Sequence, residues 1–362
     1  MMEASKAVTP LKSEEGMIIF SASEASGEYC SGAVEAADHL KVLLKQEVGT
    51  YSPCVDYLNM VRQLPNIGSG DFVSEGWRRK LCEWSYEVVD HFGFDREAVS
   101  IALNYLDRYV ATKVQDCNHV IGQKEFQLLA VTCLYTALKI HGETEDPNGQ
   151  RRKLRIDAFV ELSRGFFSVD IIEEMERDIF ATLDWRVNPP TCLRFVSSIL
   201  RLCPKWTIGG IGIAHSNFIG SIFDVSRYLT ELSVCVASFS CTFKTSVIAY
   251  ASVLCAIEAL ESTRPLPYAV RVAFQNNVAD ATGLTPNCPD ILHAKAMVKE
   301  LCPDMFNKLD AFDDMPEVPH EIPDFESPSE SAQQNGGKTS PICVMDDVND
   351  SRRKRIKFSQ NS

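Results

Sequence analysis

Residues 77–113 read WRRKLCEWSYEVVDHFGFDREAVSIALNYLDRYVATK, and residues 126–144 read FQLLAVTCLYTALKIHGET. Apolar side chains in the first stretch recur at steps of three or four residues, which is the period of an amphipathic helix. This stripe consists of Trp77, Leu81, Trp84, Val88 and Phe92. Gly93 predicts the end of that helix, and Asp95 predicts the start of the next. Residues 126–138 are apolar on nearly every side, so we expect a central helix that others surround.

The same plan recurs after the strong break at Asn188-Pro189-Pro190. Thr191 is typical of a helix cap, and helices are expected at 211–228 and 229–236. Residues 242–260 form a second stretch that is apolar on every side. The chain therefore predicts two all-α halves, each of about five helices around a buried one. In the first 50 residues only Val34–Glu47 has a helical pattern, so most of that segment is expected to be disordered.

The composition indicates a globular protein with an acidic body. Its 362 residues are 45% hydrophobic and 23% charged, with a formal net charge of −13. An acidic body without a basic face argues against direct nucleic-acid binding, because that affinity depends on neutralising phosphates. No apolar run is long enough for a membrane span, and no secretory signal is expected at the start. The 13 cysteines contain no C-x-x-C pair, which favours free thiols in a reducing compartment.

The sequence contains none of the common motifs for catalysis or metal binding. The seven histidines show no ligand spacing, and no P-loop or G-x-S-x-G is present. Gly209, Gly210 and Gly212 precede a helix, but no strand comes before them, so a loop is a better interpretation than a nucleotide site. We therefore expect no cofactor, no metal and no enzymatic activity.

Residues 77–113, 126–144 and 169–185 together resemble the cyclin box. Five positions that mark the cyclin family are filled in register, namely Arg78, Asp107, Leu128, Lys139 and Glu176. Residues 226–232 (SRYLTEL) resemble the more variable C-terminal cyclin fold, and QLLAVTCLYTALKIHGET resembles the D-type branch. No Leu-x-Cys-x-Glu motif accompanies that likeness.

The resemblance implies an all-α fold of two tandem five-helix cyclin-type domains with disordered N- and C-terminal tails. The expected organisation is a mostly disordered segment at 1–50, the cyclin box at 51–187 and the C-terminal cyclin fold at 188–309. An acidic tail rich in Pro, Ser and Glu follows at 310–362 and ends in a basic run.

Three residues are expected to bind a kinase on the basis of the resemblance. Lys139 and Glu176 by themselves fit two solvated charges. In cyclins the matching pair faces the partner kinase, and Trp185 matches a bulky apolar position at the same interface. Arg78 and Asp107 lie in apolar contexts and could pin two helices together through a bidentate pair, which agrees with a structural role in the family.

A second expected surface lies on the first helix of the box. In many cyclins this patch recruits substrates or inhibitors that carry an Arg-x-Leu-type segment. The matching residues here are Trp77, Leu81, Trp84, Glu87 and Gln127. Trp77 replaces the usual methionine and Lys80 a branched apolar residue, so core packing of the two tryptophans is the alternative. Residues 140–143 (IHGE) also depart from the family pattern, where an aromatic residue precedes paired acids.

The tails contain candidate control signals. The run Arg352, Arg353, Lys354, Arg355, Ile356, Lys357 fits a nuclear import signal, with a solvated charge run as the alternative. Thr9-Pro10-Leu11-Lys12 fits a proline-directed phosphorylation site. The acidic segment resembles the degradation-prone tails of short-lived regulators, with a plain linker as the alternative. We expect the protein in the nucleus and the cytoplasm.

The function that this resemblance implies is a non-catalytic subunit that binds and activates a cyclin-dependent protein kinase and controls cell-cycle progression. One alternative is a transcription-linked cyclin or a general transcription factor of cyclin-like architecture, which usually carries a zinc ribbon and a basic face that this sequence lacks. Another alternative is an all-helical scaffold that does not activate a kinase, and the altered loop at 140–143 supports it.

Overall fold

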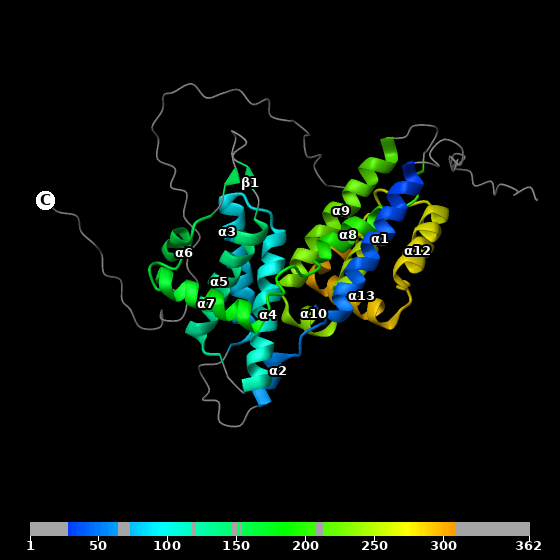
Figure 1. The fold of residues 1–362 in the computed structure, drawn as a ribbon. Helices are drawn as coiled ribbons and strands as arrows, with labels where there is room; N and C mark the ends of the chain where they lie inside the picture. The colour runs from blue at the N-terminus through cyan, green and yellow to red at the C-terminus, as the bar shows by residue number, and fades with distance from the viewer. Residues whose placement is uncertain are drawn as a thin grey trace, which may run out of the picture. The chain divides into compact units, whose positions relative to one another are not determined.

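A computed structural model describes residues 28–63, 73–117, 121–142, 144–145, 151–152, 154–206 and 213–307. The described residues form fourteen helices and one antiparallel pair of two-residue strands (Figure 1). The expected all-α fold is therefore confirmed. Among the described helices, none combines the length and the apolar character needed to cross a bilayer.

The described part of the chain divides into two compact units. The first unit contains residues 52–191 and 231–242, and the second contains residues 28–51, 192–230 and 243–306. The helices of the first unit are α2 (Tyr57–Gln63), α3 (Glu75–Phe92), α4 (Glu97–Cys117), α5 (Gln123–His141), α6 (Ile156–Leu162), α7 (Val169–Thr182) and α10 (Ala237–Thr242). The strand pair β1 (Thr144–Glu145) and β2 (Arg151–Arg152) lies in the connection that follows α5.

Helix α5 forms the centre of the first unit, as its apolar sequence predicts. It packs against α3, α4, α6 and α7, and eleven of its residues are buried. Helix α3 begins at Ser74, whose side chain accepts a hydrogen bond from the Trp77 amide, and it ends at Gly93. Gly93 has a φ of +70°, a conformation that glycine adopts without steric cost.

The second unit is also built around a helix that is buried on every side. Its helices are α1 (Glu28–Gly49), α8 (Cys192–Leu200), most of α9 (Ile213–Val234), α11 (Thr245–Ala259), α12 (Tyr268–Thr282), α13 (Pro289–Leu301) and α14 (Pro303–Asn307). Helix α11 is buried from Ser246 to Ile257 and packs against α1, α8 and α13.

The one helix expected in the first 50 residues, Val34–Glu47, is longer than predicted. It is α1, which runs from Glu28 to Gly49 and packs against α8, α11 and α12 of the second unit. Residues 1–27, for which disorder is expected, lie outside the described residues. Ala36, Leu40 and Leu43 are spaced at four and three residues and are all buried. This apolar stripe gives the segment a place in the core.

The two helices expected at 211–228 and 229–236 are a single helix. Helix α9 continues without a break from Ile213 to Val234, and its final residues from Glu231 onward group with the first unit. Leu229 and Thr230 are buried within it. No glycine or proline interrupts residues 221–234, so the backbone has no local reason to break there.

Candidate functional site

A buried ion pair connects α3 to α4 in the first unit. Arg78 Nε and Nη2 donate to the two carboxylate oxygens of Asp107, at 2.8 and 2.7 Å. The two side chains are only 1% and 3% exposed. Burial works against the charge of Arg78, but the charge and hydrogen bonds of Asp107 hold the pKa of Arg78 well above its ordinary value. Arg78 is therefore charged at neutral pH.

Three further hydrogen bonds complete this pair. Tyr57 Oη and Ser240 Oγ donate to the Asp107 carboxylate at 2.8 and 2.9 Å, and Arg78 Nη1 donates to the Val234 carbonyl at 2.8 Å. The pair thus connects α2, α3 and α4 with residues 234–240. A buried ion pair is stable only when its remaining donors and acceptors are satisfied, and these contacts supply that satisfaction. Sequence reasoning missed Tyr57 and Ser240 because no local pattern relates either residue to Asp107.

Leu128 is a family-marking residue like Arg78 and Asp107, and it borders a shallow hollow on the first unit. It lies on α5, is half-buried and packs against the core. The hollow has a volume of about 450 Å³. Its other lining residues are Gly122, Gln123, Lys124, Glu125, Phe166, Phe167 and Ile171. Leu128 therefore differs from the fully buried Arg78 and Asp107 in being partly open to solvent.

Lys139 and Glu176 form an ion pair between α5 and α7. Lys139 Nζ lies 2.8 Å from a carboxylate oxygen of Glu176, and their side chains are 48% and 10% exposed. The buried Thr136 hydroxyl donates to the other Glu176 oxygen at 3.2 Å. Partial burial lowers the pKa of Lys139, but the hydrogen bond and charge of Glu176 outweigh it and raise that pKa above its ordinary value. The result is a fixed carboxylate beneath a cation that solvent can reach.

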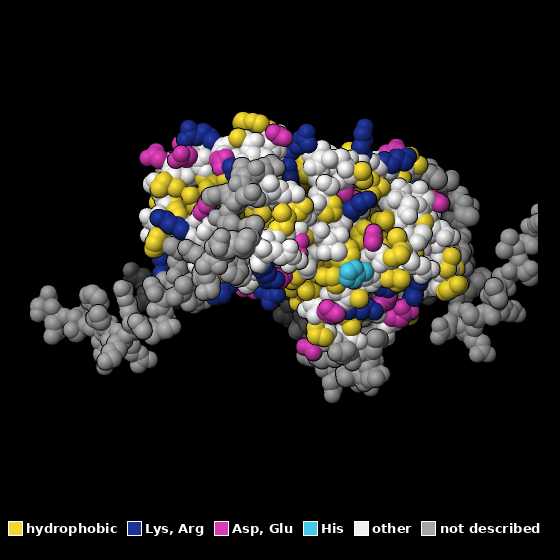
Figure 2. All heavy atoms as spheres, turned by 90° about the horizontal axis from the view of Figure 1, so that it is seen from below, with side chains coloured by type: hydrophobic (Ala, Val, Ile, Leu, Met, Phe, Trp, Pro, Cys, Tyr) yellow, Lys and Arg dark blue, Asp and Glu magenta, His cyan; other side chains and the backbone are white. Residues whose placement is uncertain are grey.

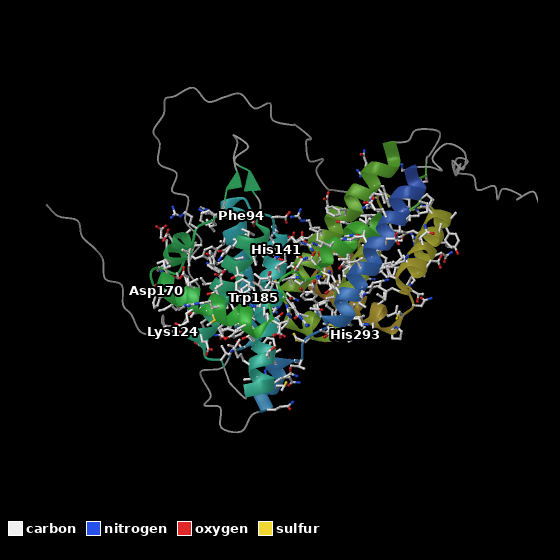
Figure 3. All side chains as sticks on the ribbon, viewed as in Figure 1. Phe94, Lys124, His141, Asp170, Trp185 and His293 are labelled. Atoms are coloured by element: carbon white, nitrogen blue, oxygen red, sulfur yellow. The ribbon has the colours of Figure 1, made fainter. Side chains whose placement is uncertain are left out.

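Trp185 lies just after the end of α7 and is 73% exposed (Figure 3). Its ring stacks on Phe180, with centroids 4.7 Å apart and an angle of 15° between the ring planes. Asp184 and Trp185 have φ values of +51° and +60°, a conformation that bulky side chains rarely adopt. The turn is held by a hydrogen bond from the Trp185 amide to the Phe180 carbonyl at 3.0 Å. Backbone strain of this kind is found at functional sites more often than elsewhere.

The Lys139–Glu176 pair and the Phe180–Trp185 stack both involve helix α7. Glu176 and Phe180 are four residues apart on α7 and so share a face, and Phe180 carries Trp185. We call Lys139, Glu176, Phe180 and Trp185 the α5–α7 strip. Sequence reasoning missed Phe180, although its position one turn beyond Glu176 was a usable signal.

The turn after α7 is also fastened to α4 and α5. His141 Nε2 lies 2.8 Å from the Val187 carbonyl, and the buried Tyr105 hydroxyl hydrogen-bonds to the same carbonyl. Ile140 next to it is 42% exposed. His141, which lies in the segment that departs from the family pattern, therefore helps to hold Val187, two residues beyond Trp185.

The five residues of the expected helix-one patch do not form one exposed surface. Leu81, Trp84 and Gln127 are buried, at 2%, 4% and 5% exposure, whereas Trp77 is half-buried and Glu87 is exposed. Core packing, the alternative to docking, therefore describes Trp84, while Trp77 remains partly accessible. Thr9 and the basic run Arg352, Arg353, Lys354, Arg355 and Lys357 lie outside the described residues.

Charged side chains of both signs are visible on the face shown in Figure 2. Basic and acidic side chains are interspersed with hydrophobic ones on that face of the described residues.

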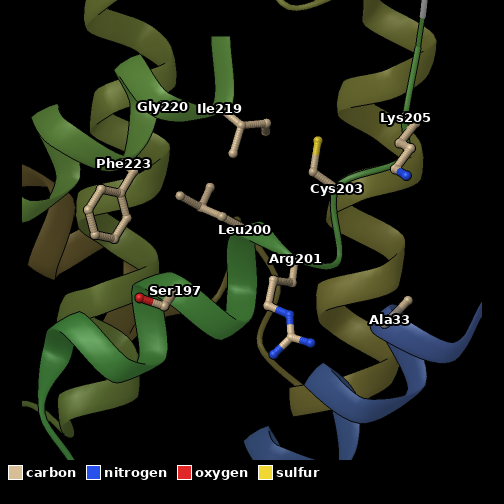
Figure 4. Close-up of a pocket in the computed structure, with 10 residues that line it drawn as sticks. Ala33, Ser197, Leu200, Arg201, Cys203, Lys205, Ile219, Gly220 and Phe223 are labelled. Carbon is tan, nitrogen blue, oxygen red and sulfur yellow. The ribbon is translucent and has the colours of Figure 1, made fainter. Parts of the chain in front are cut away.

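In the second unit a cavity of about 570 Å³ lies between α1, α8 and α9 (Figure 4). Apolar side chains such as Leu200, Ile219 and Phe223 line it, together with Arg201 and Lys205.

Comparison with known proteins agrees with the resemblance. Residues 38–188 match the family "Cyclin, N-terminal domain". Cyclin-D3-1 of Arabidopsis thaliana is 29% identical over 211 residues, which are 58% of this chain and 48% of that protein. Cyclin-D3-3 of the same plant is 33% identical over 125 residues, or 34% of this chain and 32% of that protein. The chain thus spans less than half the length of either relative.

The fold also has a counterpart among solved structures. A viral cyclin from herpesvirus saimiri matches with a TM-score of 0.50 at 15% identity, over 76% of this chain and 100% of that one. At this low identity the likeness shows the fold alone.

Proposed function

Because residues 38–188 match the cyclin N-terminal domain family, we propose that this chain is a non-catalytic regulatory subunit that binds and activates a cyclin-dependent protein kinase and acts in cell-cycle progression. The observation that carries this proposal is the α5–α7 strip. It combines an accessible cation, a carboxylate fixed beneath it and a stacked, exposed tryptophan. Tryptophan side chains are enriched among the residues that contribute most to binding at the centre of protein interfaces.

Activation follows from preferential binding to one kinase conformation. A kinase transfers phosphate only when its Lys–Glu pair and its metal-binding Asp are aligned. A partner that binds the aligned conformation more tightly shifts the kinase population toward it. The strip supports such binding because its groups are held before a partner arrives: Glu176 by Thr136 and Lys139, and Trp185 by Phe180. The phosphate donor and the metal belong to the kinase.

The test is phosphate transfer by a panel of cyclin-dependent kinases with and without the chain. The informative variant is the exchange Lys139→Glu with Glu176→Lys, because it retains an ion pair within the chain but reverses the charges offered to a partner. Activation should be lost while the unfolding temperature stays near that of the wild type. Lys113→Glu is the matched control, since Lys113 pairs with Asp178 on the same helix α7, outside the strip.

Trp185→Ala tests the apolar part of the strip. It should weaken kinase binding by at least about 2 kcal/mol, roughly 30-fold, because a stacked aromatic anchor is lost. Unchanged activation by both the charge exchange and Trp185→Ala would favour the all-helical scaffold that does not activate a kinase. Calorimetric titration against the activated kinase gives the affinity directly.

Substrates or inhibitors are proposed to meet the first unit near Trp77 and Glu87, the two accessible residues of the helix-one patch. Trp77→Ala should then raise the KM for a substrate protein without changing that for a short peptide.

The basic run at 352–357 is proposed to direct nuclear import, so that the protein occupies nucleus and cytoplasm. Replacing Lys354 and Arg355 with alanine in a fluorescent fusion should reduce the nuclear share.

A further inference from the structure

Two pairs of cysteine side chains lie where residues 231–242 contact the rest of the first unit. The Sγ atoms of Cys82 and Cys235 lie 3.4 Å apart, and those of Cys54 and Cys241 lie 3.8 Å apart. Each pair joins a residue of the cyclin box to a residue more than 150 positions later in the chain. All four are free thiols. Neither pair is near the strip's Lys139 or Trp185 in sequence, and the proposed function does not use them.

The two partners in the Cys82–Cys235 pair differ in exposure and in charge environment. Cys82 is fully buried, whereas Cys235 is partly exposed. The Cys82 thiol donates to Cys235, which lowers the pKa of Cys235. Burial opposes that effect and the charge of Arg78 adds to it. Arg78 is close because its Nη1 donates to the carbonyl of Val234, the preceding residue. Cys235 therefore has the features of an attacking thiolate.

The second pair offers an internal comparison. The pKa of Cys54 is raised by its hydrogen bond to Cys241, by burial and by the charge of Asp107. The charge of Asp107 thus raises the pKa of Cys54, whereas the charge of Arg78 lowers the pKa of Cys235.

We propose that Cys235 and Cys82 are a peroxide-reactive dithiol that closes to a disulfide between α3 and the residues after α9. The Cys235 thiolate attacks one oxygen of hydrogen peroxide and the O–O bond breaks. Cys235 becomes a sulfenic acid, and the departing hydroxide takes up the proton released from Cys235 to form water. The Cys82 sulfur then attacks the Cys235 sulfur, the S–O bond breaks, and a second water leaves with the Cys82 proton. Two thiols are oxidised and one peroxide is reduced to two waters.

The geometry requires only a small movement. A disulfide needs a sulfur–sulfur distance of about 2 Å, so the two Sγ atoms must approach by roughly 1.4 Å. The new bond would join the same two segments as the Arg78–Val234 hydrogen bond and link Cys235 to α3 covalently. In a reducing compartment such a bond is transient, and a thiol reductant reverses it.

The experiment uses the reduced full-length chain, brief exposure to hydrogen peroxide, alkylation of remaining thiols and mass spectrometry without reduction. Trypsin releases Cys82 in peptide 81–96, and Cys235 together with Cys241 in peptide 228–244. Chymotryptic cleavage after Phe239 separates the last two. The expected product is a link between Cys82 and Cys235 that dithiothreitol removes.

Matched serine variants complete the test. Cys235→Ser should abolish the link to peptide 81–96, whereas Cys241→Ser and Cys54→Ser should leave it intact. Oxidised wild-type chain should also unfold at a higher temperature than reduced chain, a shift that Cys235→Ser lacks. Full alkylation of Cys82 and Cys235 after peroxide, preferential linkage of Cys54 to Cys241, or oxidation of Cys235 to sulfinic acid without a link would overturn the proposal. None of these outcomes depends on kinase activation.

Discussion

At the scale of single residues, the Asp107 carboxylate joins several elements of the first unit. It accepts hydrogen bonds from Arg78, Tyr57 and Ser240 while almost fully buried. Asp107→Asn keeps the shape of the side chain but leaves the Arg78 charge without a counter-ion. We expect the free energy of unfolding to fall by about 3–5 kcal/mol, as when one partner of a buried ion pair is removed. Urea denaturation followed by circular dichroism measures this loss.

Asp157→Asn is the control for that substitution in the same unit. Asp157 pairs with Arg155 at 3.7 Å, and its side chain is 64% exposed. Solvent screens such a pair, so its loss should change the free energy of unfolding by less than about 1 kcal/mol. Equal losses for the two variants would contradict a structural role for the Arg78–Asp107 pair.

The residue scale also shows what the sequence could and could not predict. Arg78, Asp107, Lys139 and Glu176 are recognisable because their spacing and helix context match a family pattern. Nothing in that pattern shows that Ser240 reaches Asp107 from 133 positions away. It also does not show that Gln127 is buried, whereas the apolar stripe already offers core packing for Trp84. Contacts of this kind depend on tertiary packing, which a periodic apolar pattern does not encode.

At the scale of elements, the C-terminal end of α5 depends on Gly142. A Cβ at this position would lie 2.5 Å from the Leu138 carbonyl oxygen, closer than such atoms approach in proteins. Gly142→Ala should therefore displace the last turn of α5 and lower the free energy of unfolding by about 1–3 kcal/mol. Because Lys139 lies in that turn, kinase activation should fall as well.

Gly122→Ala is the matched control at the other end of α5. A Cβ at Gly122 meets nothing within 4 Å. Its unfolding curve and its kinase activation should stay close to those of the wild type. If Gly142→Ala also left stability and activation unchanged, the close approach of residue 142 to the Leu138 carbonyl would be contradicted.

Helix α1 contributes a charged group to the start of α11. Glu47, which is 1% exposed, accepts hydrogen bonds from the Ser246 amide at 2.6 Å and the Ser246 hydroxyl at 2.7 Å. The residue before α11, Lys244, provides no side-chain cap, so Glu47 supplies the acceptor for its first turn. A single-helix sequence pattern cannot predict this, because the capping group comes from another helix.

The same contact predicts a pH dependence. Burial raises the pKa of Glu47 above its ordinary value of 4.5, against the opposing effect of the Ser246 hydrogen bonds. The folded chain therefore binds this proton more tightly than the unfolded chain. The Glu47 contribution to stability is fully present below the unfolded pKa and is lost as the pH rises through the folded pKa. The free energy of unfolding of the wild type minus that of Glu47→Gln should fall over this range. A difference that rises with pH would contradict it.

At the scale of the whole molecule, each compact unit is built from segments that are not consecutive in the chain. Residues 28–51 precede residues 52–191 in the chain, yet they belong to the unit formed by residues 192–230 and 243–306. The sequence pattern predicts a helix at Val34–Glu47 but does not show what it packs against, because the stripe of Ala36, Leu40 and Leu43 finds its partners only in later helices. The division of the chain into an N-terminal tail, a box and a second domain therefore does not describe how its cores are built.

Two cores should respond separately to substitutions. Leu40 on α1 is fully buried, and Leu40→Ala should cost about 2–5 kcal/mol because it leaves a cavity. Val42, two residues later, is 54% exposed, and Val42→Ala should cost less than about 0.5 kcal/mol.

Hydrogen exchange measured by mass spectrometry on the full chain locates these effects. Leu40→Ala should speed amide exchange in α8, α11 and α12, the helices that contact α1, before it affects α3, α4 and α5. Asp107→Asn should show the reverse order, because its partners lie in α2, α3 and residues 234–240. If either variant accelerated exchange equally in both sets of helices, the two units would unfold as one. The N-terminal helix would then stabilise the cyclin box as much as it does the helices it touches.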